Sequence, residues 1–90
     1  MEKIIELEAD YLNDKETMSS YMAELFSFPS YFGRNLDAVY DLLSEVSEDT
    51  IFTIDLEALQ EIVSNEYAYR FLKMLVDACK NNPHLDIRLM

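Results

Sequence analysis

The residues whose spacing is most distinctive are acidic, and they follow the chain's only glycine, Gly33. In a helix, Asp37, Asp41 and Glu45 would stack at i, i+4 and i+8 on one face. Like charges at this spacing cost a helix about 0.2–0.5 kcal/mol per pair. The helix dipole compensates Asp37 in the first turn, whereas Asp41 has no lysine or arginine three or four residues away in the helix. Such a locally unfavourable choice indicates a functional surface, and a plain solvated acidic face is the alternative.

Aromatic residues adjoin these acids. Tyr40 lies between the apolar and acidic faces of the same helix, and Tyr31 and Phe32 lie in the loop before it. An exposed aromatic side chain beside acids suits an interface anchor, because it offers apolar area with a polar tip. The alternative is that these rings form the half-buried rim of the core, and we favour that interpretation for Phe32.

Residue patterns that carry catalysis or bind metals are few. His84 is the only histidine and lies in a predicted loop, where we interpret it as a solvated residue. Cys79 lies on an apolar helical stripe and is interpreted as an inert, buried thiol. One glycine excludes a P-loop or a dinucleotide fingerprint, and two helical carboxylates supply too few oxygens for Ca²⁺ or Mg²⁺. We therefore expect no enzyme activity, no metal and no cofactor. A carboxylate–metal hydrolase is the alternative, and metal binding by the two aspartates would favour it.

Charge restricts the partners. The chain has 90 residues, with 18 acidic and 7 basic side chains and a net charge of −11. This balance argues against nucleic acid or an anionic membrane as a partner and favours a basic one. Residues 1–66 hold 16 of the acids, so the site for a basic partner should lie there. A single cysteine excludes an internal disulfide, and no apolar run approaches the roughly 18 residues of a membrane span. With no signal peptide apparent, we expect a cytoplasmic protein.

The elements that position these residues alternate regularly. Buried strands are predicted at residues 3–7 and 50–54, and a half-exposed closing strand is predicted at 85–89. Helical patterns fill the intervals, at residues 15–26, 36–46, 56–62 and 65–80. Each helix follows a residue that can cap it: Asp14, Asn35, Asp55, and Ser64 or Asn65. Helices between successive strands imply parallel pairing, so we predict one α/β domain over residues 1–90, a small three-stranded parallel sheet packed with four helices (β-αα-β-αα-β).

The segment Phe28–Leu43 (FPSYFGRNLDAVYDLL) resembles the signature of the barstar family. The shared pattern is a proline, two aromatics, a glycine, any residue, Asn-Leu-Asp-Ala and then an aromatic–aspartate pair. The strand order and the ending LDIRL at residues 85–89 are also similar, whereas residues 51–65 match only by predicted structure. The resemblance implies an α/β inhibitor that stays in the producing cell and binds a barnase-type secreted ribonuclease before export.

The resemblance also implies roles for individual residues. The family aspartate that matches Asp41 enters the nuclease active site, where it meets the cations that hold substrate phosphate, and the one matching Asp37 supports it from one turn earlier. Tyr31 would line the catalytic cleft, and Asn35 would fix the loop and contact the partner. Tyr40 would be an aromatic contact at a position where the family often has tryptophan.

Three further positions bear on the site. Gly33 would set the loop geometry, either by adopting a positive φ or by allowing another backbone to come close. Asp77 matches a peripheral acid on the last long helix, although Lys73 and Lys80 are within helical reach and an internal pair is the alternative. Arg34 departs from the family's best-known member, which has an acid there.

We therefore predict an inhibitor of a small basic secreted ribonuclease that is monomeric when free. Its partner-binding residues would be Tyr31, Gly33, Asn35, Asp37, Tyr40, Asp41 and Asp77. An immunity protein against another basic toxin nuclease, such as a DNase, is one alternative. A non-inhibitory interaction domain that retains only the fold is another.

Overall fold

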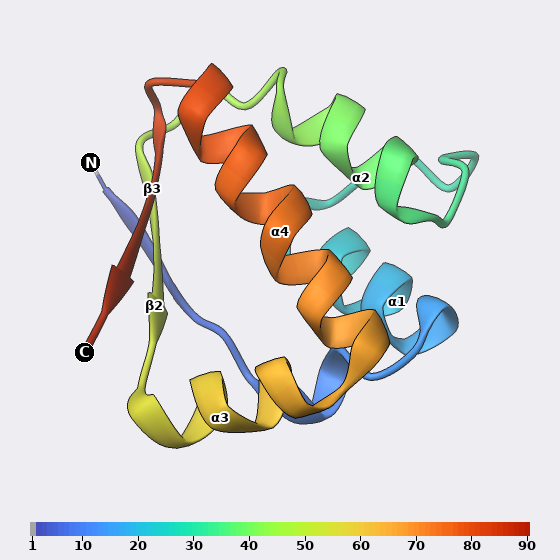
Figure 1. Ribbon diagram of the computed structural model, residues 1–90. Helices are drawn as coiled ribbons and strands as arrows, with labels where there is room; N and C mark the ends of the chain where they lie inside the picture. Colours follow the sequence, from blue (N-terminus) through green and yellow to red (C-terminus); the bar gives the residue numbers. More distant parts are fainter. Residues whose placement is uncertain (1) are drawn as a thin grey trace.

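The computed structural model describes residues 2–90 and contains four α-helices and three strands. The elements are β1 (Lys3–Glu6), a 3₁₀ turn η1 (Ala9–Tyr11), α1 (Lys15–Phe26), α2 (Leu36–Leu43), β2 (Thr50–Ile54), α3 (Leu56–Ser64), α4 (Glu66–Asn81) and β3 (Leu85–Leu89). Apart from η1, which the sequence did not predict, this is the expected β-αα-β-αα-β order (Figure 1).

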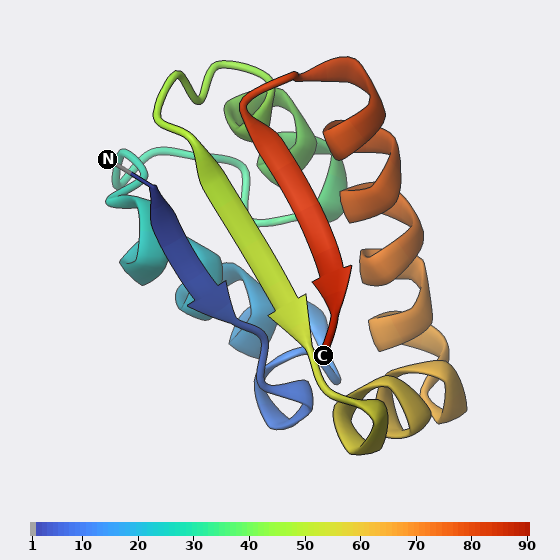
Figure 2. The same ribbon diagram turned by 90° about the vertical axis from the view of Figure 1, so that its left-hand side faces the viewer.

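The three strands form one parallel sheet in the order β1-β2-β3. All helices lie to one side of it, so the other face of the sheet is open (Figures 1 and 2). The prediction that residues 3–7 form a buried strand is therefore wrong in part, because successive side chains of β1 point to opposite faces. Ile5 faces the helices and is 4% exposed, whereas Ile4 faces solvent and is 67% exposed.

All four helices begin where the sequence places their caps. In each case a side-chain oxygen accepts a hydrogen bond from the backbone N–H three residues later. The donor–acceptor distances are 2.8 Å for Asp14 and Thr17, 2.8 Å for Asn35 and Ala38, 2.7 Å for Asp55 and Ala58, and 2.9 Å for Asn65 and Ala68. Caps of this kind stabilise a helix by about 1 kcal/mol each, which explains why the starts could be read locally.

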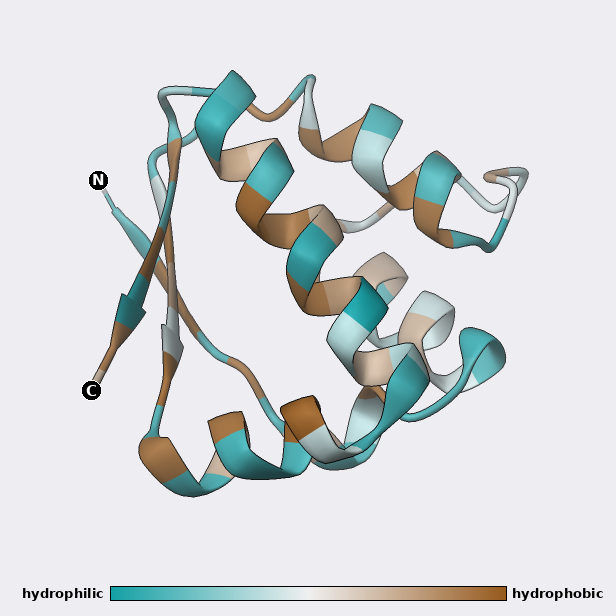
Figure 3. Ribbon diagram, viewed as in Figure 1, coloured by the Kyte–Doolittle hydropathy of each residue, from teal (hydrophilic) through white to brown (hydrophobic). Residues whose placement is uncertain are grey.

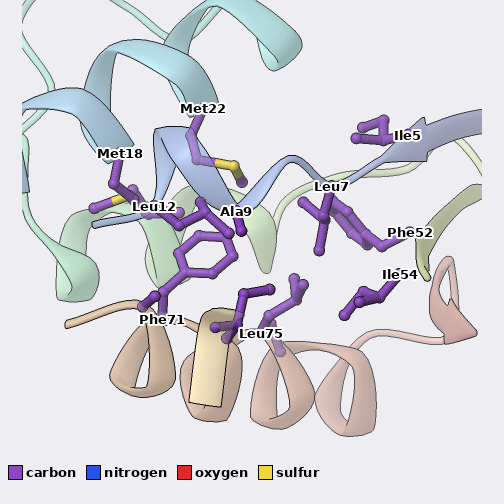
Figure 4. Close-up of a cluster of buried hydrophobic side chains, with 14 of the residues drawn as sticks. Ile5, Leu7, Ala9, Leu12, Met18, Met22, Phe52, Ile54, Phe71 and Leu75 are labelled. Carbon is purple, nitrogen blue, oxygen red and sulfur yellow. The ribbon is translucent and has the colours of Figure 1, made fainter. Parts of the chain in front are cut away.

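The core lies between the sheet and the helices. Phe52 from the central strand and Phe71 and Leu75 from α4 are fully buried, and α1 contributes Met18 and Met22 (Figure 4). Burying a large apolar side chain of this type contributes about 1.5–3 kcal/mol, so the contact of α4 with the sheet is a main source of stability. No helix within residues 2–90 is long and apolar enough to cross a membrane.

Candidate functional site

Helix α2 carries the acidic residues on its outer face. Val39 and Leu43 on its inner face are fully buried, and the hydrophilic parts of its ribbon lie on the side away from α4 (Figure 3). Asp37 and Asp41 are exposed, and within residues 2–90 no ion pair or hydrogen bond reaches either carboxylate. The two charges are one helical turn apart, and only Asp37 lies in the first turn, where the helix dipole compensates it.

Helix α2 is shorter than expected. It ends at Leu43, so the prediction of a helix to residue 46 is wrong, and Glu45 lies beyond the end of the helix. The chain turns here because the Asn82 side chain donates from Nδ2 to the backbone oxygens of Leu43 and Val46, both at 2.9 Å. Asn82 is buried and 39 residues away in sequence from Leu43, so no local pattern could have placed this end. The acidic residues of α2 itself are Asp37 and Asp41.

The two adjacent aromatic residues of the loop before α2 lie in different surroundings. Tyr31 is 86% exposed and projects into solvent. Phe32 packs onto Phe28, with ring centroids 5.3 Å apart, and Phe28 stacks on Phe26 at 5.6 Å. Phe32 is thus rim of the core, as expected, and Tyr31 is an exposed aromatic surface next to the acidic helix.

Of the two alternatives predicted for Gly33, a positive φ or a close approach, the positive φ is wrong. The left-handed residue in this loop is Arg34, with a φ of 51°. A Cβ at Gly33 would lie 3.2 Å from the Cβ of Ala38, so glycine serves here to let the loop lie close to the first turn of α2. Asn35 fixes the same turn, since its Oδ1 caps the helix and its Nδ2 donates to the Gly33 carbonyl at 3.2 Å.

Tyr40 is half-buried and joins α2 to the end of α4. The Asn81 Nδ2 donates to the Tyr40 hydroxyl at 2.8 Å and to the carbonyl oxygen of Asp77 at 3.0 Å. Asp77 is exposed and lies one turn before Asn81, and no ion pair joins it to Lys73 or Lys80 in the part of the chain that the structure describes. The structure therefore brings Asp77 to the side of α4 that is linked to Tyr40.

Asn81 and Asn82 are site-supporting residues that the sequence pattern did not reveal. Together with Pro83 they indicated only the end of a helix. Asparagine at a helix end is common, and the bonds of these side chains to Tyr40 and Leu43 join residues that lie about 40 positions apart in the chain. One signal was present, since two adjacent amides before a proline offer more donors than a helix end needs.

Cys79 and His84 lie outside this site. Cys79 is half-buried and not fully buried as predicted. This burial raises the pKa of its thiol to about 11, with a smaller contribution from Asp86, which favours an inert thiol. His84 is exposed, and its Nδ1 lies 2.9 Å from Asp49 Oδ1. Among residues 2–90, no three side chains of the types that bind metal ions come together.

The protein is a small parallel sheet backed by helices, an α/β fold in which a short helix presents two carboxylates, unpaired within residues 2–90, beside the exposed ring of Tyr31. The comparison with family models gives the particular class. The model described as Barstar (barnase inhibitor) matches residues 2–89, so the chain belongs to the barstar family, whose members inhibit ribonucleases. A search of curated proteins gives no match.

Proposed function

We propose that this protein inhibits a small basic secreted ribonuclease of the barnase type by placing α2 in its active site. Asp41 takes the place of a substrate phosphate, and Asp37 adds a second carboxylate one turn earlier. The other partner-binding residues are Tyr31, Gly33, Asn35, Tyr40 and Asp77. In this proposal residues 1–90 form one domain that is monomeric when free, acts in the cytoplasm and has no catalytic activity of its own.

The chemistry of the target supports this assignment. A ribonuclease must hold a polyanion, so its active site presents arginine, lysine and histidine side chains at phosphate spacing. A rigid helix can offer carboxylates to these cations without offering a bond to cut. Opposite net charges also steer the two proteins together and raise the association rate.

The observation that carries the proposal is the state of Asp37 and Asp41. Both carboxylates are exposed, and neither has a cationic partner within residues 2–90. Their mutual repulsion is offset only when external cations arrive. In a member of the barstar family, a ribonuclease active site is the cationic surface that fits.

The test compares Asp41→Ala with Glu45→Ala. Both remove one exposed carboxylate from the same region, but Glu45 lies beyond the end of α2. Cleavage of a fluorogenic RNA by a small basic barnase-type ribonuclease is titrated with each variant. Truncating one partner of a buried charge pair costs about 2–5 kcal/mol, so Asp41→Ala should weaken inhibition by about 30-fold or more. Glu45→Ala should change it by less than about fivefold.

Two results would contradict the proposal. Equal losses at both positions would indicate a diffuse acidic face in place of a phosphate mimic. Failure of the unmodified protein to inhibit any barnase-type ribonuclease would remove the function itself. A basic DNase serves as the parallel target, and inhibition of the DNase alone would replace ribonuclease with a different toxin nuclease.

A further inference from the structure

Arg34 has a backbone conformation that its side-chain type does not favour. Its φ of 51° lies in the left-handed region, where a residue with a Cβ is strained. Among the described residues, Ser27 is the other non-glycine residue with a positive φ, at 54°. Ser27 ends α1, and this conformation is common at a helix end. Arg34 does not end a helix, and its side chain makes contacts that can offset the strain of this backbone conformation.

Those contacts run back to α1. The Nη2 of Arg34 donates to the Ser20 hydroxyl at 2.7 Å and to the carbonyl oxygen of Glu16 at 3.3 Å, and it lies 3.4 Å from a carboxylate oxygen of Glu16. The guanidinium carbon also lies 5.9 Å from the centre of the Phe32 ring. Ser20 and Glu16 are one helical turn apart on α1, so one planar group ties the loop to two successive turns.

We infer that Arg34 is a positioning residue for partner binding: its guanidinium fastens the loop of residues 28–35 to α1 and so fixes where α2 begins. The loop then holds Tyr31 in one place, and Asn35, the next residue, starts the helix that carries Asp37 and Asp41. The role in binding rests on the proposed function, whereas the ordering of the loop does not.

This arrangement also explains how a cation is tolerated beside an acidic binding surface. The charge of Arg34 is directed at Glu16 and Ser20, and its side chain is only 39% exposed. A basic partner meets a charge that is already compensated. An acidic residue on the partner opposite position 34 is therefore not required.

The contacts of Arg34 with α1, here called the clamp, and a simple charge effect predict opposite changes in affinity when Arg34 is replaced. Replacing Arg34 by a neutral residue makes the protein more negative, which by itself would speed association with a basic enzyme. If the clamp orders the loop, the same change lowers the fraction of molecules ready to bind. A fall of that fraction to about one-fifth raises the apparent Kd about fivefold.

The experiment uses Arg34→Asn, because asparagine tolerates the left-handed conformation but lacks the guanidinium. Ser20→Ala removes the shortest contact from the α1 side, and Arg70→Gln on α4 is the control for the loss of one positive charge. Affinity for the barnase-type ribonuclease is measured by titration well below the melting temperature. Backbone NMR relaxation at residues 31–35 is measured on the free protein, without any partner.

Arg34→Asn and Ser20→Ala should each weaken binding several-fold, about fivefold for Arg34→Asn. The double variant should lose no more than Arg34→Asn alone, and Arg70→Gln should bind as well as the unmodified protein or better. In the free protein, both single variants should increase the mobility of the loop.

Unchanged or tighter binding by Arg34→Asn would overturn the inference. Weaker binding by Arg34→Asn with unchanged binding by Ser20→Ala would also overturn it, because the guanidinium would then act on the partner directly. An ordered loop in free Arg34→Asn would also overturn it. If that loop becomes more mobile but the unmodified protein inhibits no ribonuclease, the ordering of the loop by Arg34 is supported and the proposed function is contradicted.

Discussion

Asn82 gives the most direct test of how this fold holds its acidic helix. Its side chain makes three hydrogen bonds: Nδ2 donates to the carbonyl oxygens of Leu43 and Val46, both at 2.9 Å, and Oδ1 accepts from the His84 backbone N–H, also at 2.9 Å. Asn82 is 4% exposed, so water cannot replace these bonds without opening the structure. Each is worth about 0.5–1.5 kcal/mol, so Asn82→Ala should lower the free energy of unfolding by about 3 kcal/mol.

The neighbouring residue supplies the control. Asn81 is exposed, and its Nδ2 bonds to the Tyr40 hydroxyl and to the Asp77 carbonyl, which water can also satisfy. Asn81→Ala should cost less than about 1 kcal/mol. Urea unfolding followed by circular dichroism measures both variants, and for a domain of this size 3 kcal/mol lowers Tm by roughly 12–24 °C. Equal losses for the two variants would refute the argument that the buried amide fixes the end of α2.

The other predictions concern Gly33, the effect of salt, and Cys79. Gly33→Ala should change stability by less than about 1 kcal/mol, because φ is not positive and only the Ala38 methyl must give way. Its affinity for the ribonuclease should fall, because that shift moves the first turn of α2; unchanged affinity by calorimetric titration would remove Gly33 from the site. In stopped-flow measurements, the association rate should drop at least about tenfold between 0.1 M and 1 M salt, as the Debye length shrinks from about 10 Å to about 3 Å, while dissociation changes less. An association rate that does not change with salt would indicate an apolar interface formed mainly by Tyr31 and Tyr40. With its pKa raised to about 11, the Cys79 thiol should react at least about tenfold more slowly at pH 8 than in the urea-unfolded chain, and equal rates would contradict its partial burial.

Helix starts, strand positions and the acidic face could be read from the chain itself because each depends on a few neighbouring residues. A cap such as Asp14 or Asn35 needs only the N–H three residues later. The pairing of Asp37 with Asp41 on one face follows from the helical repeat alone. The segment that resembles the barstar signature, residues 28–43, contains the same helix start and acidic pair, so the sequence alone indicated the family.

Features that depend on distant partners could not be read in this way. Helix α2 ends where it does because an amide from the end of α4 reaches its last carbonyl, and no pattern within residues 36–46 encodes that contact. Ile4 is exposed because the helices all pack on the other face of the sheet. Arg34, and not Gly33, takes the left-handed backbone, and the residues that bind its guanidinium, Ser20 and Glu16, lie more than a dozen residues earlier in the chain. A local cap or strand pattern involves residues within one turn of each other, whereas these outcomes depend on groups that meet only once the core has brought the elements together.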